Sequence, residues 1–468
     1  MLVRPSCHRQ LKNRPRGVRF TGPMTVPVIK TGNPAGDAEV AALKEILRGG
    51  SLKAAGEAGD LDVSAIVARI IEQVRTGGDL AAAELTSSLD QADIDPAGLR
   101  VPEPALRRAH KSADPRFLEV VRSVAANIRQ YQQSILVAAP PALRRGGREL
   151  AVRYTPLDRV GVYVPGGRAL YPSTVLMTVI PAQVAGVGEI AMASPPTGGD
   201  INPVALAMAW EFGITEVYRL GGAPAIAALA FGTETIPPVQ KIVGPGNAFV
   251  AEAKRQVMGK VGIDNIAGPS EVLIIADQTA NPAWIAADML AQAEHNPGSA
   301  VLVTVSEDLA RQVAGEIDRQ LPLLDRRDPT AEAIREYSAV ILVGDIQEAC
   351  ELADDFAPEH LQIITGDDQA VLAKVRNAGA IFVGPYTPVP VGDYCAGPSH
   401  VLPTGGTAKF SGPLSCNDFM KPSSILWYDA ASLAEDAPDV VELARREGLT
   451  AHARAVEIRT GPAAGSVQ

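Results

Sequence analysis

Short apolar segments alternate with helical segments through the middle of the chain, and this alternation restricts the fold more than any other feature. Parallel strands need a crossover connection, which is usually a helix, so the pattern is typical of βαβ units on a mostly parallel sheet. A first series of strands is predicted at 161–164, 190–193, 217–220 and 241–243, with helices around 202–212 and 224–231. A second series is predicted at 272–276, 300–304, 339–343, 361–364 and 381–383. We therefore expect an α/β protein with two Rossmann-like doubly wound units.

The segments on either side of these units carry mainly helical patterns. Apolar residues recur at i, i+3, i+4 and i+7 over 61–75, where Gly77 and Gly78 end the pattern, and a second helix is predicted over 115–128. The segment after about residue 405 has few strand signals and ends in a helical run at 439–447. We expect a helical N-terminal portion, partly packed with the second unit, and a small helical tail. The expected boundaries are 24–162, 163–270, 271–404 and 405–468.

The first 23 residues form a separate case. They carry six basic residues and no acidic one, and they lack the apolar core of a secretory signal. We expect residues 1–23 to be a disordered basic extension ahead of an alternative start at Met24.

Composition excludes several function classes. Lys and Arg number 43 against 53 Asp and Glu, and the formal charge of −10 would repel a phosphate backbone or an anionic membrane. The longest apolar stretch, 175–193, is interrupted by Pro181, Gln183 and Glu189, so it cannot span a bilayer. The four cysteines are far apart and form no Cys-x-x-Cys pair, which favours a reducing compartment. We expect a cytoplasmic protein with no nucleic-acid or membrane partner.

A dinucleotide-binding turn must leave a strand and open a helix. The near match to G-x-G-x-x-G at 186–191 leaves a helix and enters a strand, so we treat it as a chance match. Three glycine- and proline-rich turns do leave predicted strands, at 164–167, 221–224 and 244–247. Each alone is also ordinary turn chemistry, but three in succession favour phosphate or ribose binding.

Two motifs offer candidate metal ligands and proton acceptors. Gln292 and His295 are spaced i, i+3 at the end of a predicted helix, so both could contact one metal ion; the alternative is an exposed histidine favoured by the helix dipole. Glu359 and His360 precede a predicted strand and have different intrinsic pKa values. Their joint action requires irregular backbone, which Pro358 allows; the alternative is a polar loop.

A Gly/Pro-rich stretch after the last predicted strand contains Asp393, Cys395 and His400. In open α/β sheets ligands bind outside the carboxyl ends of strands, so we expect a site there. Asp393 offers zinc a hard oxygen ligand, and Cys395 competes as a ligand. Near the end of the chain, Glu447 and His452 add another carboxylate and imidazole.

Together these motifs resemble the histidinol dehydrogenase family, and the resemblance extends from about residue 60 to the end of the chain. As a set, the matching stretches are highly specific. They are YVPGGRALYPSTVLMTVIPAQVAGV, KIVGPGNAFVAEAKRQV, NIAGPSEVLIIAD, AQAEHNPGSAVLVT, DFAPEHLQIIT, VGDYCAGPSHVLPTGGTAKFSGPL and REGLTAH.

The resemblance implies a zinc-dependent enzyme that oxidises L-histidinol to L-histidine through histidinal with two NAD, in the final steps of histidine biosynthesis. It also implies a homodimer with one zinc ion per subunit and shared active sites, in which the tail reaches the partner. The implied zinc ligands are Gln292, His295, Asp393 and His452, and the implied acid–base pair is Glu359 and His360. The implied substrate contacts are these four ligands with Ser270, His360, His400 and Glu447, and the implied NAD contacts are Tyr163, Asn247 and the position of Pro224.

Pro224 is the one departure from the family's pattern, which commonly has Gln in a GGAQAIAAL turn. Proline lacks both the side-chain amide and the backbone N–H. Cofactor affinity and cofactor choice are therefore the properties that we expect to differ.

Three alternatives remain. A paralogue that oxidises another hydroxy compound would not need both Glu447 and His452. A zinc hydrolase that binds no dinucleotide is favoured by Pro224 alone, and an absolute requirement for NAD would exclude it. A non-catalytic binding protein would have lost part of the polar set, which is intact.

Overall fold

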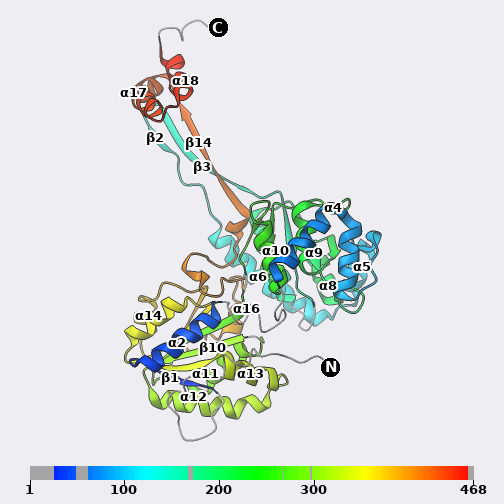
Figure 1. The fold of residues 1–468 in the computed structure, drawn as a ribbon, viewed down its shortest axis with the longest axis vertical. Coiled ribbons are helices and arrows are strands. Elements are labelled where there is room, and N and C mark those ends of the chain that lie inside the picture. The colour runs from blue at the N-terminus through cyan, green and yellow to red at the C-terminus, as the bar shows by residue number, and fades with distance from the viewer. Residues whose placement is uncertain (1–25, 49–61, 167–171, 267, 296–297, 462–468) are drawn as a thin grey trace.

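The computed structural model describes residues 26–48, 62–166, 172–266, 268–295 and 298–461. The expected extension at 1–23 lies outside these ranges. Two α/β units lie together at one end of the molecule, and an arm of strands projects from them to a pair of helices near the C-terminus (Figure 1).

The first unit contains a five-stranded parallel sheet in the order β6-β5-β4-β7-β8. Its strands are β4 (Arg159–Tyr163), β5 (Glu189–Ser194), β6 (Glu216–Arg219), β7 (Lys241–Val243) and β8 (Gly262–Ile263). Its crossover helices are α7 (Pro172–Ala185), α8 (Pro203–Glu211), α9 (Gly222–Phe231) and α10 (Ala248–Val257).

The second unit contains a six-stranded parallel sheet in the order β1-β11-β10-β9-β12-β13. Its strands are β1 (Val28–Lys30), β9 (Ser270–Ala276), β10 (Gly298–Thr304), β11 (Ala339–Leu342), β12 (His360–Ile364) and β13 (Ala380–Val383). Its helices are α2 (Pro34–Leu47), α11 (Pro282–Ala293), α12 (Glu307–Gln320), α13 (Arg327–Tyr337), α14 (Ile346–Phe356), α15 (Asp368–Leu372) and α16 (Val389–Tyr394).

The two units share one strand order. Apart from β1, which adds to the edge of the second sheet, the first strand of each series is central, the next two follow on one side, and the last two lie on the other. The order therefore reverses between β4 and β7 and between β9 and β12, which are the switch points of doubly wound sheets. The predicted fold class and both series of strands are confirmed.

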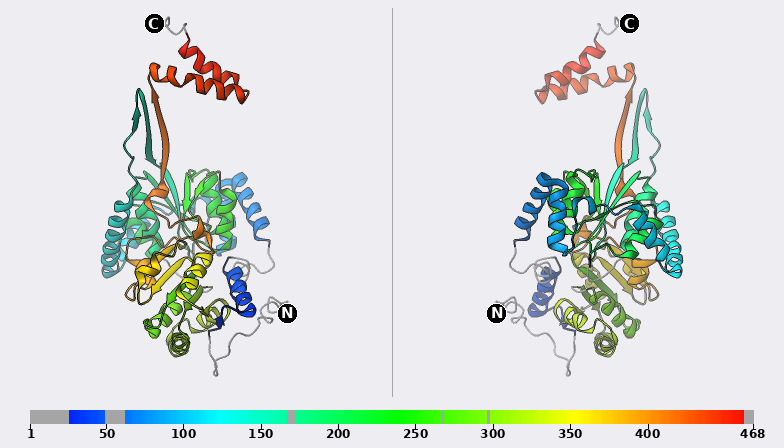
Figure 2. Two further views of the ribbon diagram at one scale, coloured as in Figure 1. Left: turned by 90° about the vertical axis from the view of Figure 1, so that its left-hand side faces the viewer. Right: turned by 90° about the vertical axis from the view of Figure 1, so that its right-hand side faces the viewer.

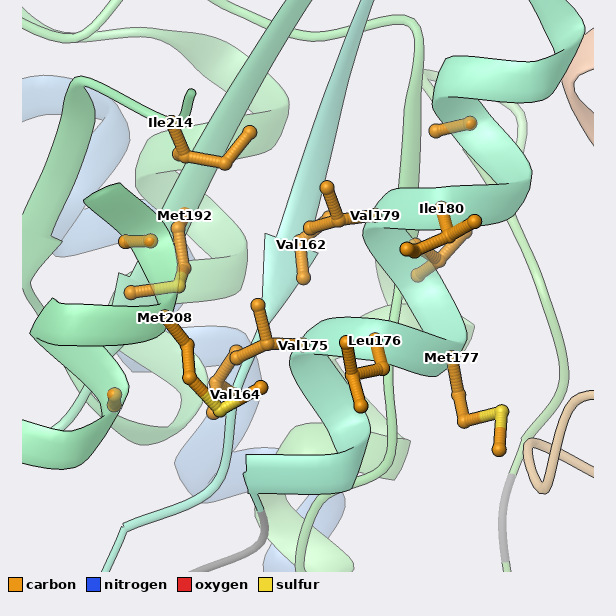
Figure 3. Close-up of a cluster of buried hydrophobic side chains, with 14 of the residues drawn as sticks. Val162, Val164, Val175, Leu176, Met177, Val179, Ile180, Met192, Met208 and Ile214 are labelled. Carbon is orange, nitrogen blue, oxygen red and sulfur yellow. The ribbon is translucent and has the colours of Figure 1, made fainter. Parts of the chain in front are cut away.

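Helices cover both faces of each sheet, which explains why the strands are continuous apolar runs. Val162 of β4 packs with Val179 of α7, Met192 of β5 and Met208 of α8 in one core (Figure 3). Tyr163 belongs to the opposite core, with α4, α9 and α10. In the second unit, α11, α12 and α13 cover one face, and α2 and α14 cover the other.

The N-terminal portion contains α4 (Val63–Asp90), α5 (Glu103–Ser112) and α6 (Pro115–Ile135). The predicted end of the first helix at Gly77 and Gly78 is only a kink. Gly78 has a φ of 56° and a ψ of −140°, and helical structure resumes to Asp90. Helix can resume because the Glu234 carboxylate accepts a hydrogen bond from the Asp79 N–H at 2.7 Å. Short 3₁₀ turns occur at Pro96–Gly98, Leu321–Leu323, Thr407–Lys409 and Cys416–Phe419.

The arm corrects the expectation of mainly helical flanks. It is an antiparallel sheet in the order β14-β3-β2, formed by β2 (Leu143–Arg145), β3 (Arg148–Pro156) and β14 (Met420–Tyr428), and it ends in α17 (Ala430–Arg446) and α18 (Thr450–Thr460). Figure 2 shows that these helices lie at the end of the arm, away from the two units. Most β14 side chains are exposed, so no alternation between core and solvent marks the strand in the sequence.

In the described part of the chain, no helix combines the length and apolarity that a membrane crossing requires.

Candidate active site

Glu359 and His360 lie at the amino-terminal edge of the second sheet. His360 opens β12 and pairs with Val272 of β9. Only 6% of Glu359 and 4% of His360 is exposed. The pair is therefore enclosed by the protein, unlike the polar loop that was the alternative.

The backbone before β12 brings the two side chains together. α14 ends at Ala357, whose φ of 49° and ψ of 62° are left-handed, and Pro358 follows. The Glu359 carboxylate accepts a hydrogen bond from the Glu271 N–H at 2.9 Å, and its Oε2 lies 3.6 Å from Nδ1 of His360. Adjacent residues can face one another here because the segment has not yet become regular strand.

The His360 ring lies between two carboxylates. Its Nε2 is 3.6 Å from Oδ1 of Asp393, on the opposite side from Glu359. Burial by itself would lower the pKa of His360, but the two carboxylates outweigh burial and raise that pKa to about 9. The ring is therefore a stronger base than an ordinary histidine.

Asp393 reaches His360 from α16, and its place corrects one expectation. We expected this loop at the carboxyl ends of the strands, whereas the structure places Asp393 beside the first residue of β12. α16 packs against β13, where a Cβ on Gly392 would lie 2.6 Å from the Phe382 ring, and the Phe382 ring also contacts His360. Burial raises the pKa of Asp393, but hydrogen bonding and charge from His360 outweigh it and leave the pKa lowered.

His295, just after the end of α11, lies within the electrostatic reach of this cluster, and Gln292 lies about one turn before it at the end of the same helix. Gln292 is 2% exposed, and within the described residues neither polar atom of its side chain has a hydrogen-bond partner. His295 follows the cap at Glu294, and its side chain is exposed. Desolvation lowers the pKa of His295 while the charge of Asp393 opposes that change, which indicates that the ring faces the cluster. Pro297, predicted to end the helix, lies outside the described residues.

Ser270 and His400 complete the group. Ser270 opens β9, and its hydroxyl bonds the Glu359 carboxylate. His400 is half-buried and bonds the backbone of Asp393; burial lowers its pKa although Asp393 acts in the other direction. The neighbouring Ser399 hydroxyl donates to the carbonyl oxygen of Met177 in α7, so this loop is anchored to the first unit.

Glu447 and His452 do not join this cluster within one chain. Glu447 caps α17 and His452 lies in α18, so both are at the far end of the arm (Figure 1). Both side chains are exposed.

The donor set fits a metal ion only in part. No group of three or more His, Cys, Asp or Glu side chains within the described ranges is arranged to hold one. Gln292, His295 and Asp393 nevertheless offer an amide, an imidazole and a carboxylate, which are donors that zinc accepts. The unpartnered, buried Gln292 amide is the observation that favours a ligand at this position.

Glu271 is a candidate that sequence reasoning missed. It is 5% exposed, and its Oε1 accepts a hydrogen bond from the Gly405 N–H at 2.9 Å. Burial first, and then the charge of Glu359, raise the pKa of Glu271 to about 8. The available signal was an acid at the start of the otherwise apolar run SEVLIIA, where a solvated carboxylate is not expected.

The predicted dinucleotide contacts lie in the first unit, at the carboxyl edge of its sheet. The Tyr163 hydroxyl, at the end of β4, accepts a hydrogen bond from the Gly222 N–H at 3.1 Å. Asn247 caps α10 by accepting from the N–H groups of residues 249 and 250, each at 3.1 Å. Gly244, after β7, has a φ of 117°, and a Cβ on it would lie 2.1 Å from the Tyr163 carbonyl oxygen, so this close approach requires glycine.

Pro224 is buried in the first turn of α9. The N–H groups of a first turn have no intrahelical partner, so proline removes no helical hydrogen bond there. It does remove one donor from the edge where a dinucleotide is expected. The first candidate turn, 164–167, is described only to Gly166.

Comparisons with known proteins agree on one family. The family model described as histidinol dehydrogenase matches residues 54–460. A histidinol dehydrogenase of Rhodopirellula baltica is 50% identical over 411 residues, covering 88% of this chain and 89% of that protein. One of Bacillus subtilis is 48% identical over 411 residues, covering 87% and 96%. The crystal structure of histidinol dehydrogenase from Elizabethkingia anophelis superposes with a TM-score of 0.86 at 31% identity, covering 94% of this chain and 98% of that one.

Proposed function

The chain belongs to the histidinol dehydrogenase family and is an oxidoreductase, and on this premise we propose that it oxidises L-histidinol to L-histidine through histidinal. The proposed reaction uses one zinc ion per subunit and two NAD, and it completes histidine biosynthesis in the cytoplasm. The observation that carries the proposal is the buried cluster in which His360 lies between Glu359 and Asp393, 3.6 Å from each.

Gln292, His295 and Asp393 would hold the zinc ion, with His452 of the partner subunit as the fourth ligand. When bound, zinc supplies positive charge that orients the substrate through its amine and imidazole nitrogens. The convergence of α11 and α16 on this point, and the unpartnered Gln292 amide, support this assignment.

His360 is the proposed base of the first oxidation. It would take the proton of the substrate hydroxyl, and bound NAD would supply the acceptor for the hydride of the carbinol carbon. The flanking carboxylates raise its pKa to about 9, which stabilises the ring once it has accepted the proton; at neutral pH the ring must first lose the proton that this pKa places on it. Ser270 and His400 lie close enough to the pair to offer the substrate polar partners.

Glu359 is the proposed base of the second oxidation. Glu359 would remove a proton from the water that adds to the aldehyde, and a second bound NAD would supply the acceptor for the hydride of the resulting hydrate. Burial raises the pKa of Glu359, which makes its carboxylate a better proton acceptor.

The chain connection supports NAD binding at the first sheet's carboxyl edge. β8 ends with Ile263 at the carboxyl edge of the first sheet, and β9 begins with Ser270 at the amino edge of the second sheet. Seven residue steps span at most about 25 Å, so a dinucleotide at the first edge can reach the proton-transfer cluster at the second.

Exposed apolar residues on the arm support the proposed homodimer. Three large apolar side chains of the arm are mostly exposed: Leu426 (68%) and Trp427 (61%) in β14, and Leu443 (63%) in α17. The same arm carries Glu447 and His452. Large apolar side chains that are exposed on one part of a molecule favour its burial against another chain. Docking of the arm on a second copy would also deliver the partner subunit's Glu447 and His452 to the cluster.

The test is to mix zinc-loaded protein with L-histidinol and NAD and to measure reduced cofactor against histidine formed. We expect about two reduced cofactors per histidine, as the four-electron change requires, and loss of the reaction in a chelator-treated sample. No cofactor reduction and no histidine despite bound zinc would overturn the proposal and favour a paralogue with another substrate or a zinc hydrolase.

A further inference from the structure

Asp90 places a carboxylate at the carboxyl edge of the first sheet. It is the last residue of α4, but it packs beside the turns that follow β5 and β6. A Cβ on Gly221 would lie 2.4 Å from Oδ2 of Asp90 and 2.6 Å from Cβ of Pro195. The carboxylate is therefore pressed against the glycine turn that also contains Gly222 and Pro224.

This carboxylate has no polar partner that the fold requires. Within the described ranges, Asp90 makes no hydrogen bond or ion pair. By contrast, the carboxylate of Asp200, a residue after β5, accepts a hydrogen bond from the Arg219 guanidinium at 2.7 Å. Burial raises the pKa of Asp90 to about 6, so it is still mainly ionised at neutral pH. A half-buried charge without a partner is unfavourable in the empty site and indicates a ligand that donates hydrogen bonds.

The position agrees with what a doubly wound unit needs. In such units a carboxylate beyond the second strand accepts hydrogen bonds from a ribose of the dinucleotide. Here the second strand is β5, which ends at Ser194 and is followed directly by Pro195 and Pro196 rather than by an acid. Asp90 fills that place from a different segment of the chain.

We propose that Asp90 accepts hydrogen bonds from a ribose of the dinucleotide and, through its charge, disfavours a 2′-phosphate, so that it sets the preference for NAD over the phosphorylated cofactor. This inference rests on the proposed function and adds a specificity residue to it. Hydrogen bonding by Asp90 matters more for dinucleotide binding in this chain because Pro224, in the neighbouring turn, offers neither an amide side chain nor an N–H.

The test compares Asp90→Asn with the matched control Asp93→Asn, which removes the same charge from an exposed position three residues away. ADP-ribose and its 2′-phosphate are titrated into each protein by calorimetry, so that binding is measured without turnover. For Asp90→Asn we expect the Kd of ADP-ribose to rise about tenfold and the preference over the 2′-phosphate to fall by a similar factor, because a charge-assisted bond is lost. The KM for L-histidinol is expected to stay within about twofold, and Asp93→Asn is expected to match the parent protein.

An Asp90→Asn variant that binds ADP-ribose within twofold of the parent, with the same preference, would overturn the inference. A parent protein that neither binds ADP-ribose nor reduces NAD would instead overturn the proposed function itself. The two failures are distinguished by the parent protein alone.

Discussion

The position of His452 on the arm predicts how much activity dimers of two inactive variants should recover. Glu359 belongs to the cluster in the α/β units, whereas His452 lies at the end of the arm of the same chain. If each arm serves the partner's cluster, a site contains Glu359 of one subunit and His452 of the other. The variants Glu359→Gln and His452→Ala should each be inactive alone, because every site in each homodimer carries one substitution.

A mixed dimer of the two variants should recover activity. One of its sites combines both substitutions, and the other combines two unchanged residues, so a purified heterodimer should show about half the activity of the parent dimer. The variants are produced together with two different affinity tags, and dimers that carry both tags are isolated and assayed with L-histidinol and NAD. The rate should rise with substrate as in the parent protein, because the recovered site is complete.

The control pairs two substitutions in the same cluster, Glu359→Gln and His295→Ala. Both residues belong to the α/β units, so each site of that heterodimer keeps one defect and no activity should return. Heterodimers of Glu359→Gln and His452→Ala that form normally but stay inactive would refute the shared site. Full activity of the His452→Ala homodimer would refute the role of the arm.

Further predictions concern stability and the metal. Asp90 has its pKa raised from 3.8 to about 6, so its contribution to stability is present below about pH 4 and is lost as pH rises through 6. Asp90→Asn should therefore unfold less readily than the parent at pH 8, by about 1 to 2 kcal/mol in denaturant titration once solvent screening of this half-buried group is discounted, with no difference near pH 4. Gly244→Ala should destabilise the first unit by about 3 kcal/mol, because the alanine would adopt a φ of 117° and meet the Tyr163 carbonyl oxygen; a change below 1 kcal/mol in the same titration would contradict the described turn. Arg148, which is 6% exposed, donates to Asp436 at 2.6 Å and joins β3 to α17, so Arg148→Met should speed hydrogen exchange in α17 without affecting the two sheets. A chelator should abolish turnover of L-histidinol, and zinc should restore it; activity that persists in metal-free protein, measured by atomic absorption, would exclude the proposed zinc role.

The double α/β architecture was accessible from the sequence because its strands are buried on both faces. Strands such as β9 and β10 then become continuous apolar runs that local composition reveals. β14 was missed for the opposite reason, since its residues are mostly exposed and its apolar side chains follow no core-facing pattern. The kink at Gly78 was taken for a helix end because a distant side chain, Glu234, allows the helix to resume there.

The sequence by itself determined which residues are candidates for the chemistry. Glu359, His360, Asp393, Gln292 and His295 could each be selected because their residue types and flanking turns are those of proton transfer and metal binding. Local patterns do not, however, specify distances between segments that are far apart in the chain. Only the tertiary structure placed Asp393 at the amino end of β12, and only the tertiary structure showed the Asp90 carboxylate packed against the turn at Gly221 and His452 far from the cluster of its own chain. The reason is that long-range packing decides which edges of two sheets face each other.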